Sequence, residues 1–364
     1  MKIFYSAYTC KGNVGDLLIN KYQIEEYAKY ADVYVDLTGM PQYFANCILD
    51  GKNPKVHDFV SEYNMSYRGF KMFKVLSLLK TEGFTHFTKS PGPYAILSLP
   101  FKRLLVRLLG AWGYLIARKY GMKVLALGID LNMDSQVGWL YKLNLKYFNQ
   151  YNLLGLRSKR NKMILESSVK NTCYCPDMAF LCPDLKESYS LQRKKVALSF
   201  RQVDDIDKLI HILQNVCEHY TSIGYEIHIV YQVAEDDKFC KLLLTNLSKY
   251  HPKYRNSLIS FSDLHDYEQY DIVFSNRLHV LLMGAMHGAV PFAILSKDLR
   301  EHKIIDVFDS VFEERFWMYI DDGNGILDRL LSKNFSPLKK QVYHSVLIQK
   351  RLCEETIRKQ FLQN

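Results

Sequence analysis

The stretch that most constrains the fold of this chain is residues 271–295, in which short apolar and small segments follow one another. Residues 272–274 are an apolar run of the kind that forms a strand buried on both faces. Residues 280–286 then fit a buried helix that Gly288 closes, and residues 292–295 fit a second strand. Such a strand–helix–strand unit is typical of a parallel sheet flanked by helices.

Arg277 and His279 stand where the first of these strands gives way to the helix. A helix N-terminus at the carboxyl end of a parallel strand favours anions, because its backbone N–H groups and its dipole point toward the ligand. An arginine beside an apolar core is costly unless an anion or a carboxylate meets it. The alternative is that both side chains merely complete a core βαβ unit.

Three motifs of the chain are distinctive: Ser-Asn-Arg-Leu-His at 275–279 with Gly-Ala at 284–285 and Gly-Ala-Val-Pro at 288–291, Gly-Asn-Val-Gly-Asp at 12–16, and Asp-Met-Ala-Phe-Leu at 177–181. Together they resemble the motifs of one known family, the polysaccharide pyruvyl transferases. Met178 stands where that family usually has proline. The family's run of glycines is replaced by Ser-Pro-Gly-Pro-Tyr at residues 90–94, which predicts a turn.

Strand-like and helical segments alternate along the whole chain, which predicts an α/β fold. Expected strands include residues 2–7, 33–37, 84–87, 123–128, 152–157, 195–202, 226–231 and 258–261. With the resemblance, this indicates two Rossmann-like domains facing across a cleft (GT-B-like), with parallel sheets and helices on both faces. We expect an acceptor domain at 1–183, a donor domain at 195–336, and a final helix at 337–364 that packs back on the first domain or forms a solvated tail.

The bulk properties narrow the class of partner. A formal charge of +10 over 364 residues favours a phosphorylated small molecule or a membrane surface. Nucleic acid ranks last because the chain has no block of consecutive Lys or Arg long enough to make a nucleic-acid arm. The sequence shows neither a secretory signal nor a run of eighteen apolar residues, so a cytoplasmic protein is expected.

The eight cysteines are scattered along the chain. Cys173, Cys175 and Cys182 lack the Cys-x-x-Cys spacing of zinc sites. We therefore expect no metal and no cofactor.

Residues 99–120 predict a basic amphipathic helix, with apolar residues along one broad stripe and Lys or Arg among them. Such a helix either packs against the sheet while its arginines reach water, or lies in the interface of an anionic bilayer. The second role suits an enzyme whose acceptor is lipid-linked.

Arg201 follows a buried strand in the second half of the chain, and we expect it to converge with Arg277 and His279 at one crevice. Two guanidinium groups and an imidazole suit a ligand that carries both a phosphate and a carboxylate. The resemblance implies that this ligand is phosphoenolpyruvate and that the reaction forms a ketal on a sugar diol. Lys303 is expected to add positive charge to the same donor site.

Under this resemblance, His279 is the expected phosphate contact and the candidate acid, since imidazole titrates near neutrality. Asp16 and Asp177 are candidate bases, although either one could instead cap a helix or pair with an arginine. The expected acceptor-binding residues are Asn13, Asp16 and Tyr94.

The resemblance also implies a saccharide acceptor of bacterial capsule or exopolysaccharide synthesis. One form of the hypothesis places that acceptor on undecaprenyl diphosphate, with the enzyme peripheral at the inner face of the plasma membrane. The alternative function is a GT-B-type glycosyltransferase with a nucleotide-sugar donor, for which Glu235, Asp236 and Asp237 are candidate ribose- or base-binding acids. A non-catalytic carbohydrate-binding protein with the same fold is a third possibility.

Overall fold

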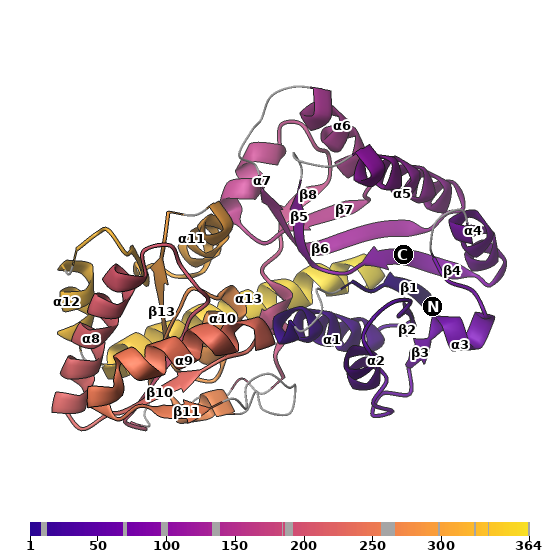
Figure 1. The fold of residues 1–364 in the computed structure, drawn as a ribbon. Helices are drawn as coiled ribbons and strands as arrows, with labels where there is room; N and C mark the ends of the chain where they lie inside the picture. The colour runs from indigo at the N-terminus through magenta and orange to yellow at the C-terminus, as the bar shows by residue number, and fades with distance from the viewer. Residues whose placement is uncertain are drawn as a thin grey trace. The chain divides into compact units, whose positions relative to one another are not determined.

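The computed structural model describes residues 1–8, 13–67, 71–95, 101–132, 139–183, 185, 192–255, 266–297, 299–323, 325–333 and 335–362. The chain divides into two compact units (Figure 1). Unit 1 comprises Met1–Lys11, Asp16–Leu181 and Arg351–Asn364, and unit 2 comprises Gly12–Gly15 and Cys182–Lys350. Each unit holds one parallel sheet, which confirms the prediction of two parallel-sheet α/β domains.

The sheet of unit 1 has the strand order β3-β2-β1-β4-β6-β7-β8, with β5 beside β6. The strands are β1 (Lys2–Ser6), β2 (Asp32–Asp36), β3 (Val56–Asp58), β4 (Phe84–Lys89), β5 (Gly92–Ala95), β6 (Lys123–Asn132), β7 (Leu153–Leu156) and β8 (Thr172–Tyr174). The helices are α1 (Val14–Ala28), α2 (Gln42–Ile48), α3 (Phe59–Tyr63), α4 (Lys71–Thr81), α5 (Phe101–Lys119), α6 (Trp139–Phe148), α7 (Lys159–Leu165) and the 3-10 turn η1 (Met178–Leu181).

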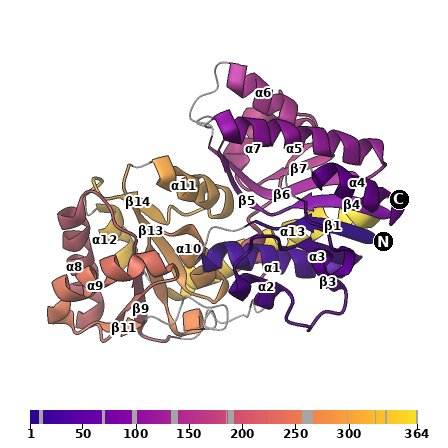
Figure 2. The ribbon, with the colours of Figure 1, turned by 45° about the vertical axis from the view of Figure 1, so that its right-hand side comes forward.

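Helices cover both faces of this sheet, as successive residues of β1 show. Phe4 packs edge-on against Phe59, with ring centroids 4.8 Å apart, and belongs to a core cluster shared with α4, α5 and α6. Tyr5 points the other way, and its hydroxyl donates to Asn20 Oδ1 of α1 at 2.7 Å. Figure 2 shows α4, α5 and α6 on one side of the sheet and α1 on the other.

Part of the predicted turn at residues 90–94 is instead a strand. β5 continues along the edge of β6 where β4 stops, pairing Gly92 with Ile129 and Ala95 with Asn132. Pro91, which cannot donate to a ladder, lies between β4 and β5, where the pairing along β6 is interrupted. Gly128, at φ 67°, lies in β6 between its residues that pair with β4 and those that pair with β5.

The sheet of unit 2 has the order β11-β10-β9-β12-β13-β14. Its strands are β9 (Lys195–Ser199), β10 (Glu226–Val230), β11 (Lys253–Arg255), β12 (Ile272–Ser275), β13 (Val290–Leu295) and β14 (Trp317–Tyr319). The helices are α8 (Ile206–Ser222), α9 (Asp237–Asn246), α10 (Leu278–Met286), α11 (Leu299–Val311), α12 (Gly325–Leu331) and α13 (Phe335–Leu362), with 3-10 turns η2 (Ala234–Asp236) and η3 (Ser248–Tyr250). The predicted strand at 258–261 lies outside the described residues.

The chain adds β10 and β11 on one side of β9, then returns to add β12, β13 and β14 on the other. The strand order therefore reverses between β9 and β12, and such switch points are where open α/β sheets bind ligands.

The stretch from β12 to β13 forms the predicted strand–helix–strand unit. Val273 faces α10, where a Cβ added to Gly284 would lie 2.7 Å from its side chain, so glycine lets the helix lie close to the strand. Phe274 faces the opposite side, where its ring centroid is 6.1 Å from that of Tyr220 in α8. Helices thus cover both faces of this sheet as well.

The last helix, α13, is continuous over 28 residues and begins two residues before the segment expected at 337. Its residues up to Lys350 cluster with unit 2, and those from Arg351 onward cluster with unit 1. In unit 2 its Lys339 ammonium pairs with the buried Asp271 carboxylate. In unit 1 its Phe361 packs edge-on against Tyr27 of α1, at 5.6 Å between ring centroids.

Candidate functional site

The carboxyl ends of β9 and β12 lie side by side at the switch point of unit 2. Ser199 pairs with Ser275, so the residues that follow leave the sheet next to each other. Asn276, only 1% exposed, joins the two strand ends. Its Oδ1 accepts a hydrogen bond from the Arg201 N–H at 2.9 Å, and its Nδ2 donates to the Arg201 carbonyl at 3.2 Å. Arg201 is thereby fixed beside the residue that precedes Arg277.

A carboxylate from the neighbouring strand end meets Arg277. The guanidinium donates from Nε to Asp236 Oδ2 at 2.9 Å and from Nη2 to Asp236 Oδ1 at 2.5 Å, a bidentate pair. Asp236 ends η2, which follows β10, and only 5% of its side chain is exposed, whereas 26% of the Arg277 side chain is exposed. The arginine beside the apolar core is therefore met by a protein carboxylate, which is one of the two partners expected from the sequence.

Asp236 also lies within the electrostatic influence of Arg201. Burial raises the pKa of the Asp236 carboxyl, while the hydrogen bond and charge of Arg277 and the charge of Arg201 oppose that rise. Two arginines from adjacent strand ends thus act on one buried carboxylate. From the sequence, Asp236 is expected only as a ribose- or base-binding acid of the glycosyltransferase alternative, not as a partner of these arginines.

His279 occupies the first turn of α10, whose first residue follows Arg277. Gly15 lies against it. A Cβ added to Gly15 would lie 2.1 Å from His279 Nδ1, so only glycine allows this approach. Asn13 forms an antiparallel bridge with Val233, and its Oδ1 accepts from the Gly15 N–H at 3.0 Å.

These contacts correct two expectations about the N-terminal motif. Residues 13–15 cluster with unit 2 rather than with the domain predicted at 1–183, because their pairing partners lie beyond β10 and in α10. The residue that caps α1 is Asn13, whereas Asp16 is the third residue of that helix and belongs to unit 1.

Asp177 is engaged in a buried ion-pair network of unit 1. Arg157, 2% exposed, donates from Nη1 to Asp177 Oδ2 at 3.0 Å and from Nη2 to Asp130 Oδ2 at 2.7 Å. The second oxygen of Asp177 accepts from the Ala179 N–H at 3.0 Å, at the start of η1. This is the structural alternative considered from the sequence: a partner for an arginine and a cap for a helical turn.

Two further predicted residues are placed only in part. Lys303 is half-buried on α11, the helix that follows β13 at the same edge of the unit 2 sheet. Tyr94 lies in β5 of unit 1, paired with Leu131, and its side chain is outside the described residues.

Gln232 was not among the site residues predicted from the sequence. It comes two residues after β10, at the edge where Arg201 and Arg277 leave the sheet, and is 2% exposed. Its Nε2 has no hydrogen-bond partner in the described part of the chain. A buried amide donor in this state points to a ligand or water. The sequence signal that could have identified Gln232 is its position directly after the apolar strand predicted at 226–231.

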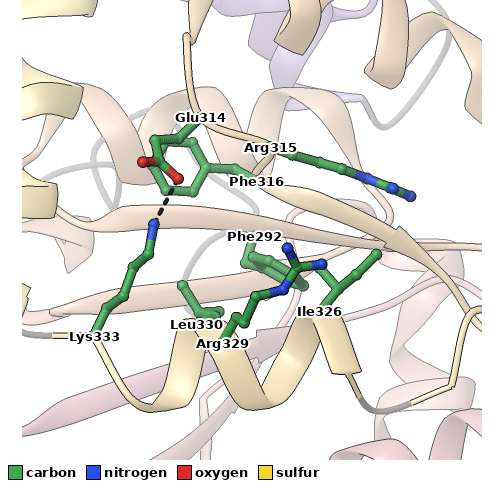
Figure 3. A pocket seen from close by; sticks show the side chains of 8 residues that line it. All are labelled: Phe292, Glu314, Arg315, Phe316, Ile326, Arg329, Leu330 and Lys333. Atoms are coloured by element: carbon green, nitrogen blue, oxygen red, sulfur yellow. Dashed lines mark hydrogen bonds and ion pairs between the residues drawn. The ribbon is translucent and has the colours of Figure 1, made fainter.

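A cavity of about 120 Å³ in unit 2 lies elsewhere, where the chain enters β14 (Figure 3). It is lined by Phe292, Glu314, Arg315, Phe316, Ile326, Arg329, Leu330 and Lys333. Its cations have partners: Lys333 donates to Glu314 at 2.6 Å, Arg315 to Asp322 at 2.8 Å and Arg329 to the Gly325 carbonyl at 3.2 Å. The cations at the strand ends lie instead at the switch point of the sheet, where open α/β sheets bind ligands.

The strand-end group brings several donor-bearing residues to one edge of the sheet: two arginines, a histidine, a buried amide and the N-terminus of α10, which has no side-chain cap. This set suits a small polyanion. Among the described residues no group of three or more His, Cys, Asp or Glu is arranged to hold a metal ion.

Comparisons with known proteins agree with the family suggested by the motifs. The model of a family described as polysaccharide pyruvyl transferase matches residues 96–298, more than half of the 364 residues. A search of curated proteins gives no match.

Several solved structures share the fold over nearly the whole chain. MurG from Acinetobacter baumannii is 13% identical, with 98% of this chain and 99% of that chain covered and a TM-score of 0.52. TarM is 10% identical, with 99% and 98% covered and a TM-score of 0.55. A UDP-N-acetylglucosamine 2-epimerase is 11% identical, with 100% and 97% covered and a TM-score of 0.56. At these identities the likeness shows a common GT-B-like fold alone.

Proposed function

Because the chain belongs to the polysaccharide pyruvyl transferase family, we propose that it transfers the pyruvyl group of phosphoenolpyruvate to a saccharide and forms a cyclic ketal. The observation that carries this proposal is the joined strand-end group of unit 2, in which Asn276 fixes Arg201 beside Arg277 at the switch point. Phosphoenolpyruvate carries a phosphate and a carboxylate on the same carbon, which two neighbouring guanidiniums match.

The bidentate pair with Asp236 is compatible with donor binding. A guanidinium has five N–H donors, so the two that meet Asp236 leave others for a ligand. The carboxylate orients Arg277 before the donor arrives, and one negative charge against two arginines keeps the group positive. In this proposal Arg201 and Arg277 bind phosphate and carboxylate, Gln232 donates to the same ligand, and Lys303 adds positive charge from α11.

The reaction begins with transfer of a proton to the methylene carbon of the enol, which leaves the central carbon cationic. An acceptor hydroxyl attacks that carbon and loses its proton, phosphate then leaves, and a second hydroxyl of the same sugar closes the ring and loses its proton. His279 is the proposed phosphate contact and acid. The fixed positive charges stabilise the departing phosphate without rearrangement.

For the acceptor side we propose Asn13, Asp16 and Tyr94 as binding residues. Asp16, in the first turn of α1, is the proposed base, and Asp177, whose two carboxylate oxygens accept hydrogen bonds inside unit 1, is assigned a structural role. The proposed acceptor is a saccharide of a bacterial capsule or exopolysaccharide, carried as a repeat unit on undecaprenyl diphosphate.

The test is to incubate the purified protein with phosphoenolpyruvate and lipid-linked oligosaccharides that contain galactose or mannose. Release of inorganic phosphate that depends on the acceptor, together with an acceptor heavier by one pyruvate less one water, supports the proposal. A parallel incubation replaces phosphoenolpyruvate by nucleotide sugars. Nucleotide release and glycosylated product there, with no phosphate from phosphoenolpyruvate, would establish the glycosyltransferase alternative instead.

A further inference from the structure

The positive charge of the chain is concentrated in one part of unit 1. Residues 71–165 contain 16 Lys and Arg and 3 Asp and Glu, a formal charge of +13, whereas the whole chain carries +10. The remaining residues therefore sum to −3. Such asymmetry within one protein indicates a surface that meets an anionic partner.

Three helices within this segment contain no acidic residue at all. They are α4 (three Lys), α5 (five Lys and Arg) and α6 (two Lys). All three contribute to the same core cluster and cover the same side of the unit 1 sheet, as Figure 1 shows. One side of the unit is thus covered by basic helices without compensating carboxylates of their own.

Large apolar side chains are exposed on the same helices. Trp112 is 64% exposed and Leu115 is 42% exposed, and their spacing of three residues places them on one side of α5. The packed side of α5 is a different one, since Tyr114 and Ala117 are buried in the core. Phe73, 36% exposed, adds a second aromatic ring on α4.

α4 and α5 lie against each other, so these residues belong to neighbouring helices. A Cβ added to Gly113 of α5 would lie 2.7 Å from Met72 Sδ of α4. Exposed cations accompany the apolar residues: Lys71 and Lys74 on α4, and Arg118 and Lys119 on α5. We call this set, with Phe73, Trp112 and Leu115, the α4–α5 outer face.

A hollow adjoins the α4–α5 outer face. It has a volume of about 540 Å³ and is lined by Val60, Asn64, Met65, Ser66, Lys71, Lys74 and Val75. This lining combines two exposed lysines with apolar side chains, which suits a headgroup phosphate and the acyl chains beside it.

From these observations we propose that the α4–α5 outer face binds the surface of an anionic phospholipid bilayer. Aromatic and aliphatic side chains would enter the interface while the cations meet headgroup phosphates, the arrangement of interfacial amphipathic helices. A nucleic acid could bind the cations of this face, but it would not account for the exposed Trp112 and Leu115 side chains. Among the described residues no helix is long and apolar enough to cross a membrane. The proposal goes beyond the ketal-forming reaction and requires neither the donor nor the acceptor.

The experiment measures binding of the full chain to sedimented vesicles, of phosphatidylglycerol or of phosphatidylcholine, without substrate. We expect salt-sensitive binding to the anionic vesicles only. Trp112→Ser with Leu115→Ser should weaken it at least about tenfold, and Lys71→Glu with Lys74→Glu at least about 30-fold. Matched controls are Met163→Ser, an apolar side chain 63% exposed on α7, and Lys249→Glu with Lys340→Glu, two exposed lysines of unit 2. Both controls should bind like the wild type, and circular dichroism verifies that each variant is folded.

A second measurement locates the contact. With Trp139 and Trp317 replaced by Phe, Trp112 is the remaining tryptophan, and brominated acyl chains should quench its fluorescence on binding. Absence of binding to anionic vesicles overturns the proposal. It is also overturned if the Trp112 and Leu115 changes leave vesicle binding intact, or if duplex DNA competes fully while Trp112 stays unquenched, which would indicate a nucleic-acid surface.

Discussion

At the scale of single residues, the bidentate pair between Arg277 and Asp236 makes a specific prediction. Lysine keeps the charge of Arg277 but cannot form the planar two-point contact with a carboxylate or phosphate. Arg277→Lys should therefore weaken phosphoenolpyruvate binding by about 10- to 100-fold, the equivalent of about 1.5–3 kcal/mol for a charged hydrogen bond. Binding is measured from the donor-dependent shift in the unfolding temperature.

Arg315→Lys is the matched control for this substitution. Arg315 also pairs with a carboxylate in unit 2, at 2.8 Å from Asp322, but it lines the cavity near β14 rather than the strand ends. Arg315→Lys should leave the phosphoenolpyruvate-dependent shift in the unfolding temperature unchanged. An equal loss in both variants would show that the Arg277 effect is general to unit 2 and not due to the ligand.

Gly15 gives a second residue-scale prediction. A Cβ at this position would overlap the His279 ring at 2.1 Å from Nδ1, so the imidazole or the loop must shift. We expect Gly15→Ala to lower the rate of acceptor-dependent phosphate release by at least about 100-fold, since displacing a reacting group by about 1 Å has that effect. Gly325→Ala is the control, because a Cβ there meets nothing within 4 Å. Unchanged turnover in Gly15→Ala would remove His279 from the proposed chemistry.

The sequence predicted part of this arrangement for a physical reason. The carboxyl ends of parallel strands meet at one edge of a sheet, so residues that follow two apolar runs, such as Arg201 and Arg277, are expected there. The contacts of Asp236 and Gly15 depend instead on the path of loops beyond a strand or before a helix. No local sequence pattern encodes that path. Nothing in the sequence distinguished Asp236 from its neighbours Glu235 and Asp237.

At the scale of elements, strongly patterned segments were predictable and pairing-dependent ones were not. The strands at β1, β9 and β12 are apolar runs whose burial follows from composition. β5 is different, because Gly92–Ala95 become a strand only through pairing with β6. The continuity of α13 is likewise a tertiary effect: its polar and apolar residues suited a helix, but the buried pair of Lys339 with Asp271 fixes where its first half lies.

The end of α13 makes a prediction about pH. His86 of β4 is 1% exposed, and the Phe361 ring lies 4.7 Å from it between centroids. Burial lowers the pKa of His86 from 6.5 to about 4, against a smaller opposing effect of the Gln360 backbone. As pH falls, His86 is therefore protonated in the unfolded chain before it is protonated in the folded protein. The contribution of neutral His86 to the free energy of unfolding is complete above pH 6.5. It is lost between pH 6.5 and about 4, and the loss amounts to roughly 3 kcal/mol.

His86→Phe isolates this contribution. Phenylalanine fills the site without titrating, so between about pH 7.5 and pH 5 the variant should lose about 2 kcal/mol less unfolding free energy than the wild type. Urea unfolding at the two pH values measures the difference. Parallel losses in both proteins would mean that His86 is protonated in the folded state or that its site opens before the unit unfolds.

At the scale of the whole molecule, positive charge occurs in two arrangements. In the strand-end group of unit 2, the proposed donor site, Asn276 holds the Arg201 backbone and Asp236 holds the Arg277 guanidinium. The charge of residues 71–165 is instead spread along helices and strands, where 16 Lys and Arg outnumber 3 Asp and Glu. A count of charged residues along the sequence reveals the spread charge of residues 71–165 directly. The strand-end group of unit 2 becomes visible only once the strand order is known.

The spread charge has a consequence for stability that needs no ligand. Like charges on one surface repel each other in the folded state, and salt weakens that repulsion because the screening length falls from about 30 Å at 0.01 M to about 8 Å at 0.15 M. The thermal unfolding midpoint should therefore rise by a few degrees when sodium chloride increases over this range at neutral pH. Lys71→Glu with Lys74→Glu lowers the charge of the segment from +13 to +9 and should reduce that rise, whereas Lys249→Glu with Lys340→Glu should not. A midpoint that falls with salt, or the same salt response in both double variants, would show that the charge of residues 71–165 does not strain the fold.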